Sequence, residues 1–260
     1  MNKKLAFTSN PLKLSLPIWI LYSIAYILLK QSKYNTLAGY QVFFGQVGLD
    51  VFLCVSTYLF YRRTIERKSK LIFILYFISF ISAAIADGVY HLGMNILNIQ
   101  YFYKINSFFE VPVIGFLLFQ LLAWSVLFFK QDGDLQLQKK HMYIPYILVS
   151  LIIFTTFTFG ITWKIDHLSL IGIYQSVDTI LEVLGFGIVT ICLARASDST
   201  LRLGSVGYLA IISSDLLIRN QVISGVIPFL SIFEVSWVLG LLLMSIGFFL
   251  RKKTLFHCYL

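Results

Sequence analysis

The sequence predicts an all-α integral membrane protein, from its apolar composition, the length of its apolar runs and the placement of its basic residues. Hydrophobic residues make up 58% of the 260 residues, only 13% are charged, and the mean hydropathy is +0.81. A water-soluble domain needs far more polar surface than this composition supplies. Several runs hold about 20 apolar residues, which is the length that an α-helix needs to cross a hydrocarbon core.

Four membrane-spanning helices are expected in the first half of the chain. Leu16–Leu29 follows a basic segment and precedes no small-residue cleavage site, so it is interpreted as a retained span rather than a signal peptide. Tyr40–Tyr61 ends at a cluster of Arg and Lys, and Leu71–His91 begins after that cluster. Phe108–Phe129 opens on a Phe-Glu-Val segment.

Four more helices are expected in the second half. Met142–Trp163 ends in an aromatic residue of the kind that lines membrane interfaces. Leu170–Ala194 carries closely spaced glycines, which favour tight helix packing. Leu203–Arg219 is short, and Pro228–Leu250 again contains Phe-Glu-Val near its start. Eight spans joined by short breaks form four helical hairpins in a single membrane domain, residues 1–260.

The third and seventh spans end in the same pattern. Each is an apolar run that closes with an aspartate and, four residues later, a basic or imidazole side chain: Asp87 with His91, and Asp215 with Arg219. This spacing places the two side chains on one helix face, one turn apart. Either pair can also be a structural pair in which the two groups neutralise each other.

The spans that follow these two are also alike, because Glu110 and Glu234 each sit in a Phe-Glu-Val segment. The similarity predicts two half-repeats in the same orientation, residues 16–129 and 142–250. Parallel repeats of this kind often share a site at their interface. Alternatively, each glutamate complements the positive end of its own helix.

The basic residues predict the orientation in the membrane. Sixteen of the 21 Lys and Arg fall on one side of the predicted spans. The positive-inside rule therefore places both termini on the cytoplasmic side of a bacterial-type inner membrane. The net charge of +9 is therefore a topology signal. The sequence lacks a basic stripe with interleaved aromatics, the pattern that indicates nucleic-acid binding. Membrane lipids are the expected surroundings.

The acidic residues point to a site. Seven of the 12 lie inside apolar runs, where an ionised carboxylate costs a few kcal/mol or more and should face the bundle interior or water. By predicted topology all seven lie between mid-membrane and the outer surface, which suggests an outward-facing acidic cavity. The seven are Asp50, Asp87, Glu110, Asp178, Glu182, Asp215 and Glu234.

The expected ligand-binding residues combine most of these acids with nearby basic and aromatic side chains. Aromatic walls beside carboxylates suit a cationic or planar ligand, although the aromatics also fit an interfacial belt. The candidates are Asp87, Tyr90, His91, Glu110, Asp178, Glu182, Asp215, Arg219, Glu234 and Trp237. Neither the histidines nor the three cysteines have metal-ligand spacing, so no metal and no cofactor is expected.

A first resemblance is to the multi-span sensor modules of bacterial signalling proteins such as diguanylate cyclases and histidine kinases. It is carried by the Phe-Glu-Val-x-Trp-x-x-Gly segment, in which Glu234, Trp237 and Gly240 stand after the aspartate of the preceding span. It implies a non-enzymatic receptor that binds a small ligand in the membrane. Because the chain ends ten residues past the last predicted span, the output is expected from a partner protein.

A second resemblance is to the lysoplasmalogenase family, eight-span enzymes that cleave the vinyl ether bond of lysoplasmalogens. The Gly-Ser pair at Gly204 and the Ser-Ser-Asp-Leu segment around Asp215 are similar to that family's Ser-Asp helix. The dipeptide Ala86-Asp87 stands where that family has Gly-Asp. It implies that Asp87 and Asp215 form a catalytic acid–base pair. Ala86 in place of glycine and Gln120 in place of histidine depart from the family pattern.

Overall fold

The computed structural model describes residues 11–31, 35–93, 110–129, 152, 154–155, 169–196, 199–224 and 235–247. These residues are almost entirely helical, as predicted. The helices are α1 (Pro11–Gln31), α2 (Asn35–Arg63), α3 (Arg67–His91), α5 (Glu110–Phe129), α7 (Leu170–Arg195), α8 (Ser199–Ser224) and a C-terminal helix (Val235–Gly247). In a hydrocarbon core a helix satisfies every backbone N–H and C=O within its own segment, so apolar runs of this length adopt it.

Four of these helices are long and apolar enough to cross a membrane, and the chain is a multi-pass membrane protein. The qualifying stretches are Leu37–Arg63, Arg67–His91, Glu110–Phe129 and Gly172–Ala194. They coincide with the predicted second, third, fourth and sixth spans.

The structure describes the other four predicted spans less fully. Leu16–Lys30 and Val235–Gly247 are shorter apolar helices at the first and eighth predicted spans, and α8 covers the seventh. The predicted fifth span, Met142–Trp163, falls almost wholly outside the described residues. The count of eight spans and the half-repeats therefore remain predictions.

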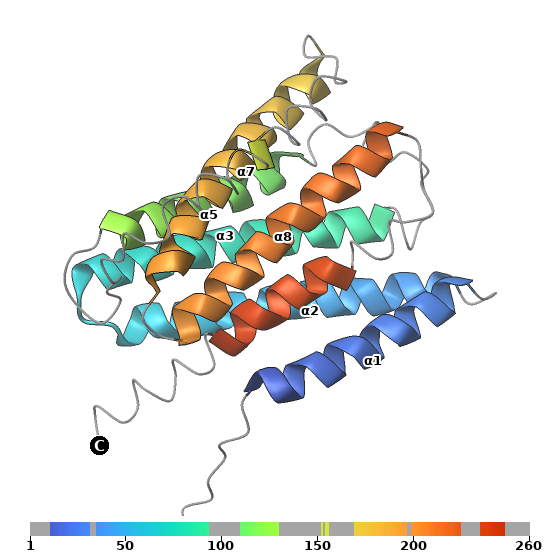
Figure 1. The fold of residues 1–260 in the computed structure, drawn as a ribbon, viewed down its shortest axis with the longest axis horizontal. Helices are drawn as coiled ribbons and strands as arrows, with labels where there is room; N and C mark the ends of the chain where they lie inside the picture. The colour runs from blue at the N-terminus through green and yellow to red at the C-terminus, as the bar shows by residue number, and fades with distance from the viewer. Residues whose placement is uncertain are drawn as a thin grey trace, which may run out of the picture.

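Helices that follow one another along the chain pack side by side from α1 to α3 and on through α5, α7 and α8 (Figure 1). The α2–α3 pair is an antiparallel hairpin with a short turn, in which the rings of Phe60 and Phe73 stack at 5.3 Å. Helix α3 is joined to α5 where the Ser79 hydroxyl donates to the Phe116 carbonyl at 3.1 Å. Short connections and local partners make this order of packing the natural one.

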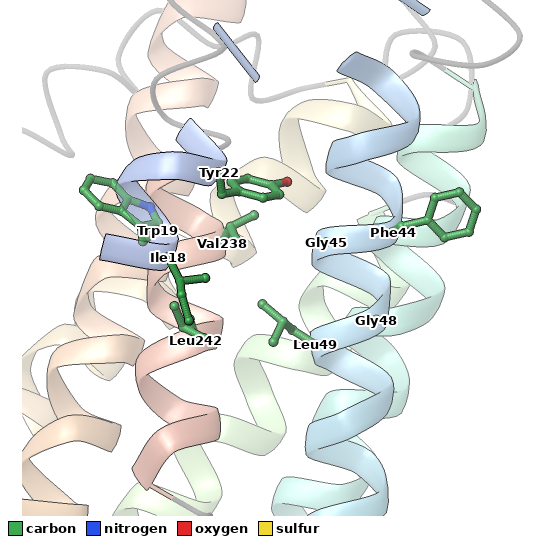
Figure 2. A pocket seen from close by; sticks show the side chains of 9 residues that line it. All are labelled: Ile18, Trp19, Tyr22, Phe44, Gly45, Gly48, Leu49, Val238 and Leu242. Carbon is green, nitrogen blue, oxygen red and sulfur yellow. The ribbon is translucent and has the colours of Figure 1, made fainter. Parts of the chain in front are cut away.

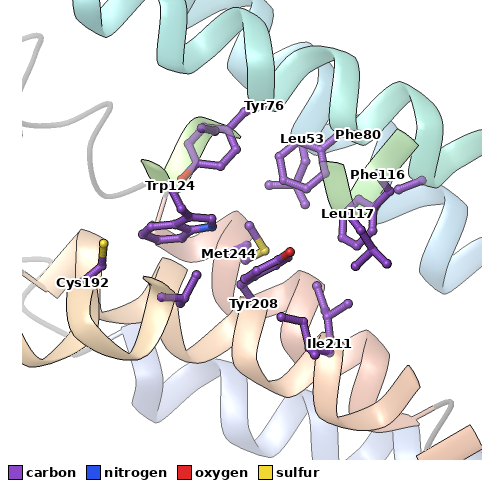
Figure 3. Packing of buried hydrophobic residues seen from close by; sticks show 14 of the residues in the cluster. Leu53, Tyr76, Phe80, Phe116, Leu117, Trp124, Cys192, Tyr208, Ile211 and Met244 are labelled. Atoms are coloured by element: carbon purple, nitrogen blue, oxygen red, sulfur yellow. The ribbon is translucent and has the colours of Figure 1, made fainter. Parts of the chain in front are cut away.

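A cluster of aromatic rings fills the centre of the bundle between α3, α5 and α8 (Figure 3). The Trp124 ring meets Tyr76 edge-on at 5.9 Å and stacks on Tyr208 at 6.3 Å, while Phe116 meets Tyr208 at 6.2 Å. Lipid tails are as apolar as these side chains, so close packing, rather than exclusion of water, holds such a core together in a membrane.

The C-terminal helix packs into the bundle through a close crossing with α8. A Cβ atom built on Gly207 would lie 2.6 Å from the Gly240 carbonyl oxygen, and one built on Gly240 would lie 2.6 Å from the Gly207 carbonyl oxygen. Only glycine at both positions allows this approach. Val238, Leu241 and Met244 are buried as a result.

Candidate functional site

Two polar layers lie at the interface of α2 and α3. Asp50 of α2 faces Asp87 of α3, and one helical turn away Gln46 of α2 faces His91 of α3. All four side chains are buried. The layers arise because each helix carries its two polar residues four apart, and the antiparallel hairpin brings the two pairs into register.

The two carboxyl groups interact directly with each other. Asp50 is 0% exposed and Asp87 is 8% exposed. Both Asp50 oxygens and the Oδ2 atom of Asp87 have no hydrogen-bond donor among the described residues. Ionised carboxylates only accept hydrogen bonds, so a bond between this pair requires that one carboxyl carry a proton. A cation placed between them would satisfy the same oxygens.

Asp215 and Trp237 complete this group from two further helices. Asp215 of α8, which is partly buried, acts electrostatically on Asp87. The indole N–H of Trp237 in the C-terminal helix also interacts with the Asp87 carboxyl, although its geometry falls short of a full hydrogen bond. We call Asp50, Asp87, Asp215 and Trp237 the carboxyl cluster. The structure thus brings together three of the predicted site residues, Asp87, Asp215 and Trp237.

His91 forms the second layer with Gln46 through a short contact between its Nε2 atom and the glutamine Oε1. The Tyr90 ring meets the His91 ring edge-on, with centroids 5.1 Å apart and planes at 79°. Lys30 of α1 acts electrostatically on the same imidazole. His91 and Tyr90 therefore border the carboxyl cluster, one turn further along α3.

Two other predicted acids lie at the α7–α8 interface. Asp178 and Glu182 of α7 are both 0% exposed, and Glu182 acts electrostatically on the Tyr208 hydroxyl of α8. Burial of these acids matches the expectation that membrane carboxylates face the bundle interior.

The last predicted residues are placed only in part. Glu110 is buried and is the first residue of α5, a position where a carboxylate complements the positive end of the helix. Arg219 lies in α8, but its side chain is outside the described residues, and so is the whole of Glu234. The proposed Asp215–Arg219 pair therefore stays a prediction.

The list of site residues read from the sequence lacks Asp50, Gln46, Gln120 and Tyr208. Gln46 and Asp50 are four residues apart on α2, which mirrors Asp87 and His91 on α3 and was a usable signal. The amide of Gln120 and the hydroxyl of Tyr208 are fully buried without a hydrogen-bond partner among the described residues. Nothing in their local sequence distinguishes them from ordinary core positions.

An apolar cavity of about 320 Å³ lies between α1, α2 and the C-terminal helix (Figure 2). None of the predicted ligand-binding residues is among its described lining residues, which distinguishes it from the outward-facing acidic cavity that the sequence suggests. We call it the apolar cavity, and its lining residues are Ile18, Trp19, Tyr22, Phe44, Gly45, Gly48, Leu49, Val238 and Leu242.

Within the described residues, no group of three or more His, Cys, Asp or Glu side chains is arranged to hold a metal ion. No protein-family model matches the chain, and no curated protein or solved structure is significantly similar to it. Inference about function therefore depends on the residues and their geometry.

Proposed function

We propose that the chain is a membrane receptor that binds a small cationic or amphipathic ligand at the carboxyl cluster and reports it to a partner protein. The observation that carries this proposal is the meeting of Asp50, Asp87 and Asp215 beside Trp237. Three acids from three helices around one point are costly in a membrane unless protons or a cation compensate them.

The chemistry of the cluster favours a cation. Carboxyl groups that meet from three helices can pair with the charge of an ammonium group, which compensates their burial. Trp237 is held in place by its packing on Phe116 of α5, with ring centroids 6.3 Å apart. A ligand that settles there would touch α2, α3, α8 and the C-terminal helix together, so its binding could change how these helices pack.

The resemblance to bacterial sensor modules supports the signalling role, with a cytoplasmic or membrane-bound partner as the output. The proposal includes eight spans as a 4+4 parallel repeat in the inner membrane, with the ligand site toward the outside and both termini in the cytoplasm. Labelling of single cysteines from either side of the membrane tests this topology. A cysteine label on the Arg62–Lys70 turn that reacts from outside would contradict it.

Ligand binding is tested with phenyltrimethylammonium, a small planar quaternary ammonium ion. A ligand that binds only the folded state raises the unfolding temperature in a saturable manner. We expect such a shift with the detergent-solubilised full chain, and Asp87→Asn should weaken the apparent affinity by about tenfold or more, or 1.4 kcal/mol.

The matched control is Glu66→Gln, because Glu66 lies outside the cluster and accepts a hydrogen bond from Ser69 at the start of α3. This variant should keep the full response to phenyltrimethylammonium. A missing shift in the unaltered protein, or an equal loss in both variants, would show that the cluster does not bind the cation.

A hydrolase of the lysoplasmalogenase type is the second candidate, favoured by one observation. Asp215 acts electrostatically on Asp87 from a separate helix, and two neighbouring carboxyls in different environments can serve as acid and base. One would protonate the vinyl ether while the other activates water, giving a fatty aldehyde and the glycerol backbone with its phosphodiester headgroup. Purified protein should then release fatty aldehyde from lysoplasmalogen, and Asp215→Asn should abolish the release.

A further inference from the structure

We infer that the apolar cavity binds one acyl chain of a membrane phospholipid, which enters sideways from the bilayer between α1 and α2. The site is separate from the carboxyl cluster and does not depend on the receptor proposal. It rests on the chemistry of the cavity wall, on the surroundings of its opening, and on a glycine that leaves space for the chain (Figure 2).

The described wall of the cavity is almost entirely apolar. Among the described lining residues, Trp19 and Tyr22 are the ones with polar side chains, and both use their donors on the backbone. The Trp19 Nε1 donates to the Val235 carbonyl at 2.9 Å, and the Tyr22 hydroxyl donates to the Gln41 carbonyl at 3.2 Å. Water needs two to four polar partners to occupy a cavity, so this cavity suits hydrocarbon instead.

The surroundings of the opening identify the hydrocarbon. Ile18 of α1 and Phe44 of α2 line the cavity and are 53% and 69% exposed, and Leu21 and Ile24 of α1 are also largely exposed. In a multi-pass membrane protein such an apolar helix surface faces lipid, and acyl chains are the apolar molecules present there at high concentration. The cavity volume is also in the range of pockets that hold small molecules.

Gly48 provides the space. A Cβ atom built on Gly48 meets nothing within 4 Å, whereas one on Gly45 would lie 2.6 Å from the Tyr22 hydroxyl. Gly45 is thus covered by the tyrosine of α1, and the opening continues past Gly48.

The experiment uses the full chain in phosphatidylethanolamine–phosphatidylglycerol vesicles with a phospholipid that carries a diazirine midway along one acyl chain. After photolysis, mass spectrometry locates the lipid adducts. We expect adducts at Ile18, Leu49 and Leu242, which line the cavity (Figure 2), to exceed by several-fold those at Leu184 of α7, which is 50% exposed and samples ordinary lipid contact.

Gly48→Leu fills the cavity and should reduce these adducts to the level at Leu184. Gly88→Leu is the matched control, because a Cβ atom on Gly88 of α3 also meets nothing within 4 Å and lies outside the cavity; it should leave the adducts unchanged. If Gly48→Leu does not fold, Ile18→Phe blocks the cavity from α1 and should act in the same way on Leu49 and Leu242.

Three outcomes would overturn the inference. Adducts spread evenly over all exposed apolar residues would indicate ordinary bilayer contact. Adducts that persist at Leu49 and Leu242 when the cavity is filled would place the lipid elsewhere. A dimer of the chain in the vesicles, together with no lipid adducts at these residues, would show that a second copy, and not lipid, covers the cavity.

Discussion

The carboxyl cluster and the apolar cavity are built on the same two helices, α2 and the C-terminal helix, yet they have opposite chemistry. Asp50 belongs to the cluster and its neighbour Leu49 to the cavity; Trp237 belongs to the cluster and its neighbour Val238 to the cavity. Successive residues of a helix point about 100° apart, so one residue step changes the face.

The difference lies in what covers each face. The cluster is enclosed by α3 and α8, so its carboxyls are buried and must find protons, partners or a ligand. Among the described helices, α1 covers the cavity, and its Trp19 and Tyr22 bridge to the other two helices and leave space between them. Burial by many helices makes a polar site possible in a membrane, and incomplete cover by one helix leaves a hydrocarbon-filled gap.

The largest expected effect comes from the crossing on which both regions depend. Gly207→Ala places a methyl group 2.6 Å from the Gly240 carbonyl oxygen and 3.0 Å from the Met244 nitrogen, both backbone atoms that cannot yield without moving the helix. Overpacking of this kind should lower the free energy of unfolding by about 1–3 kcal/mol. Thermal unfolding in detergent measures the loss.

The control for this variant is Gly204→Ala, three residues earlier on α8. A Cβ atom there would meet only the Trp124 ring at 3.7 Å, an ordinary contact, so stability should be kept. Similar losses at both glycines would mean that the crossing does not hold the C-terminal helix.

The next prediction tests whether Gln46 and His91 form a structural polar layer that is distinct from the carboxyl cluster. Gln46→Leu removes the hydrogen-bond partner that α2 provides to the buried His91, and should cost about 1–3 kcal/mol of stability. His91→Leu should cost a similar amount. Because both single variants break the same contact, the double variant should be more stable than the sum of the two losses predicts. Additive losses in a double-mutant cycle would refute the pairing.

Within the cluster itself the expected change has the opposite sign. Asp50→Asn replaces a buried acid beside Asp87 with a neutral amide, which can donate to the Asp87 carboxyl without a bound proton. Replacement of buried charged groups by neutral ones is often stabilising, so the free energy of unfolding should rise by about 1 kcal/mol. The same thermal unfolding measurement applies. A loss of stability would mean that a cation already compensates Asp50 in the ligand-free protein.

The smallest effect is expected on the cavity side. Gly48→Leu fills open space and replaces a poor helix former, so stability should be unchanged or higher by up to about 1 kcal/mol. Gly45→Leu, one turn earlier, should be destabilising because its Cβ atom would lie 2.6 Å from the Tyr22 hydroxyl. Thermal unfolding of the two variants compares them directly. If the two variants had the same unfolding temperature, the space of the cavity would also extend to Gly45, and Tyr22 would not close it there.

The sequence by itself determined that the chain is helical and membrane-embedded, and it identified Asp87, Asp215 and Trp237 as site candidates. Helix formation in lipid is a local matter, since each backbone group is satisfied within its own apolar run. The four-residue spacing of Asp87 and His91 similarly predicts a shared face without any knowledge of neighbours.

Only the tertiary structure decided that Asp50 faces Asp87, that Gln46 faces His91, and that an apolar cavity opens beside Gly48. These contacts depend on helix order, register and crossing distance, which arise from packing between segments far apart in the chain. Gly207 and Gly240 illustrate the reason: each is an ordinary small residue in the sequence, and their effect exists only where the two helices touch.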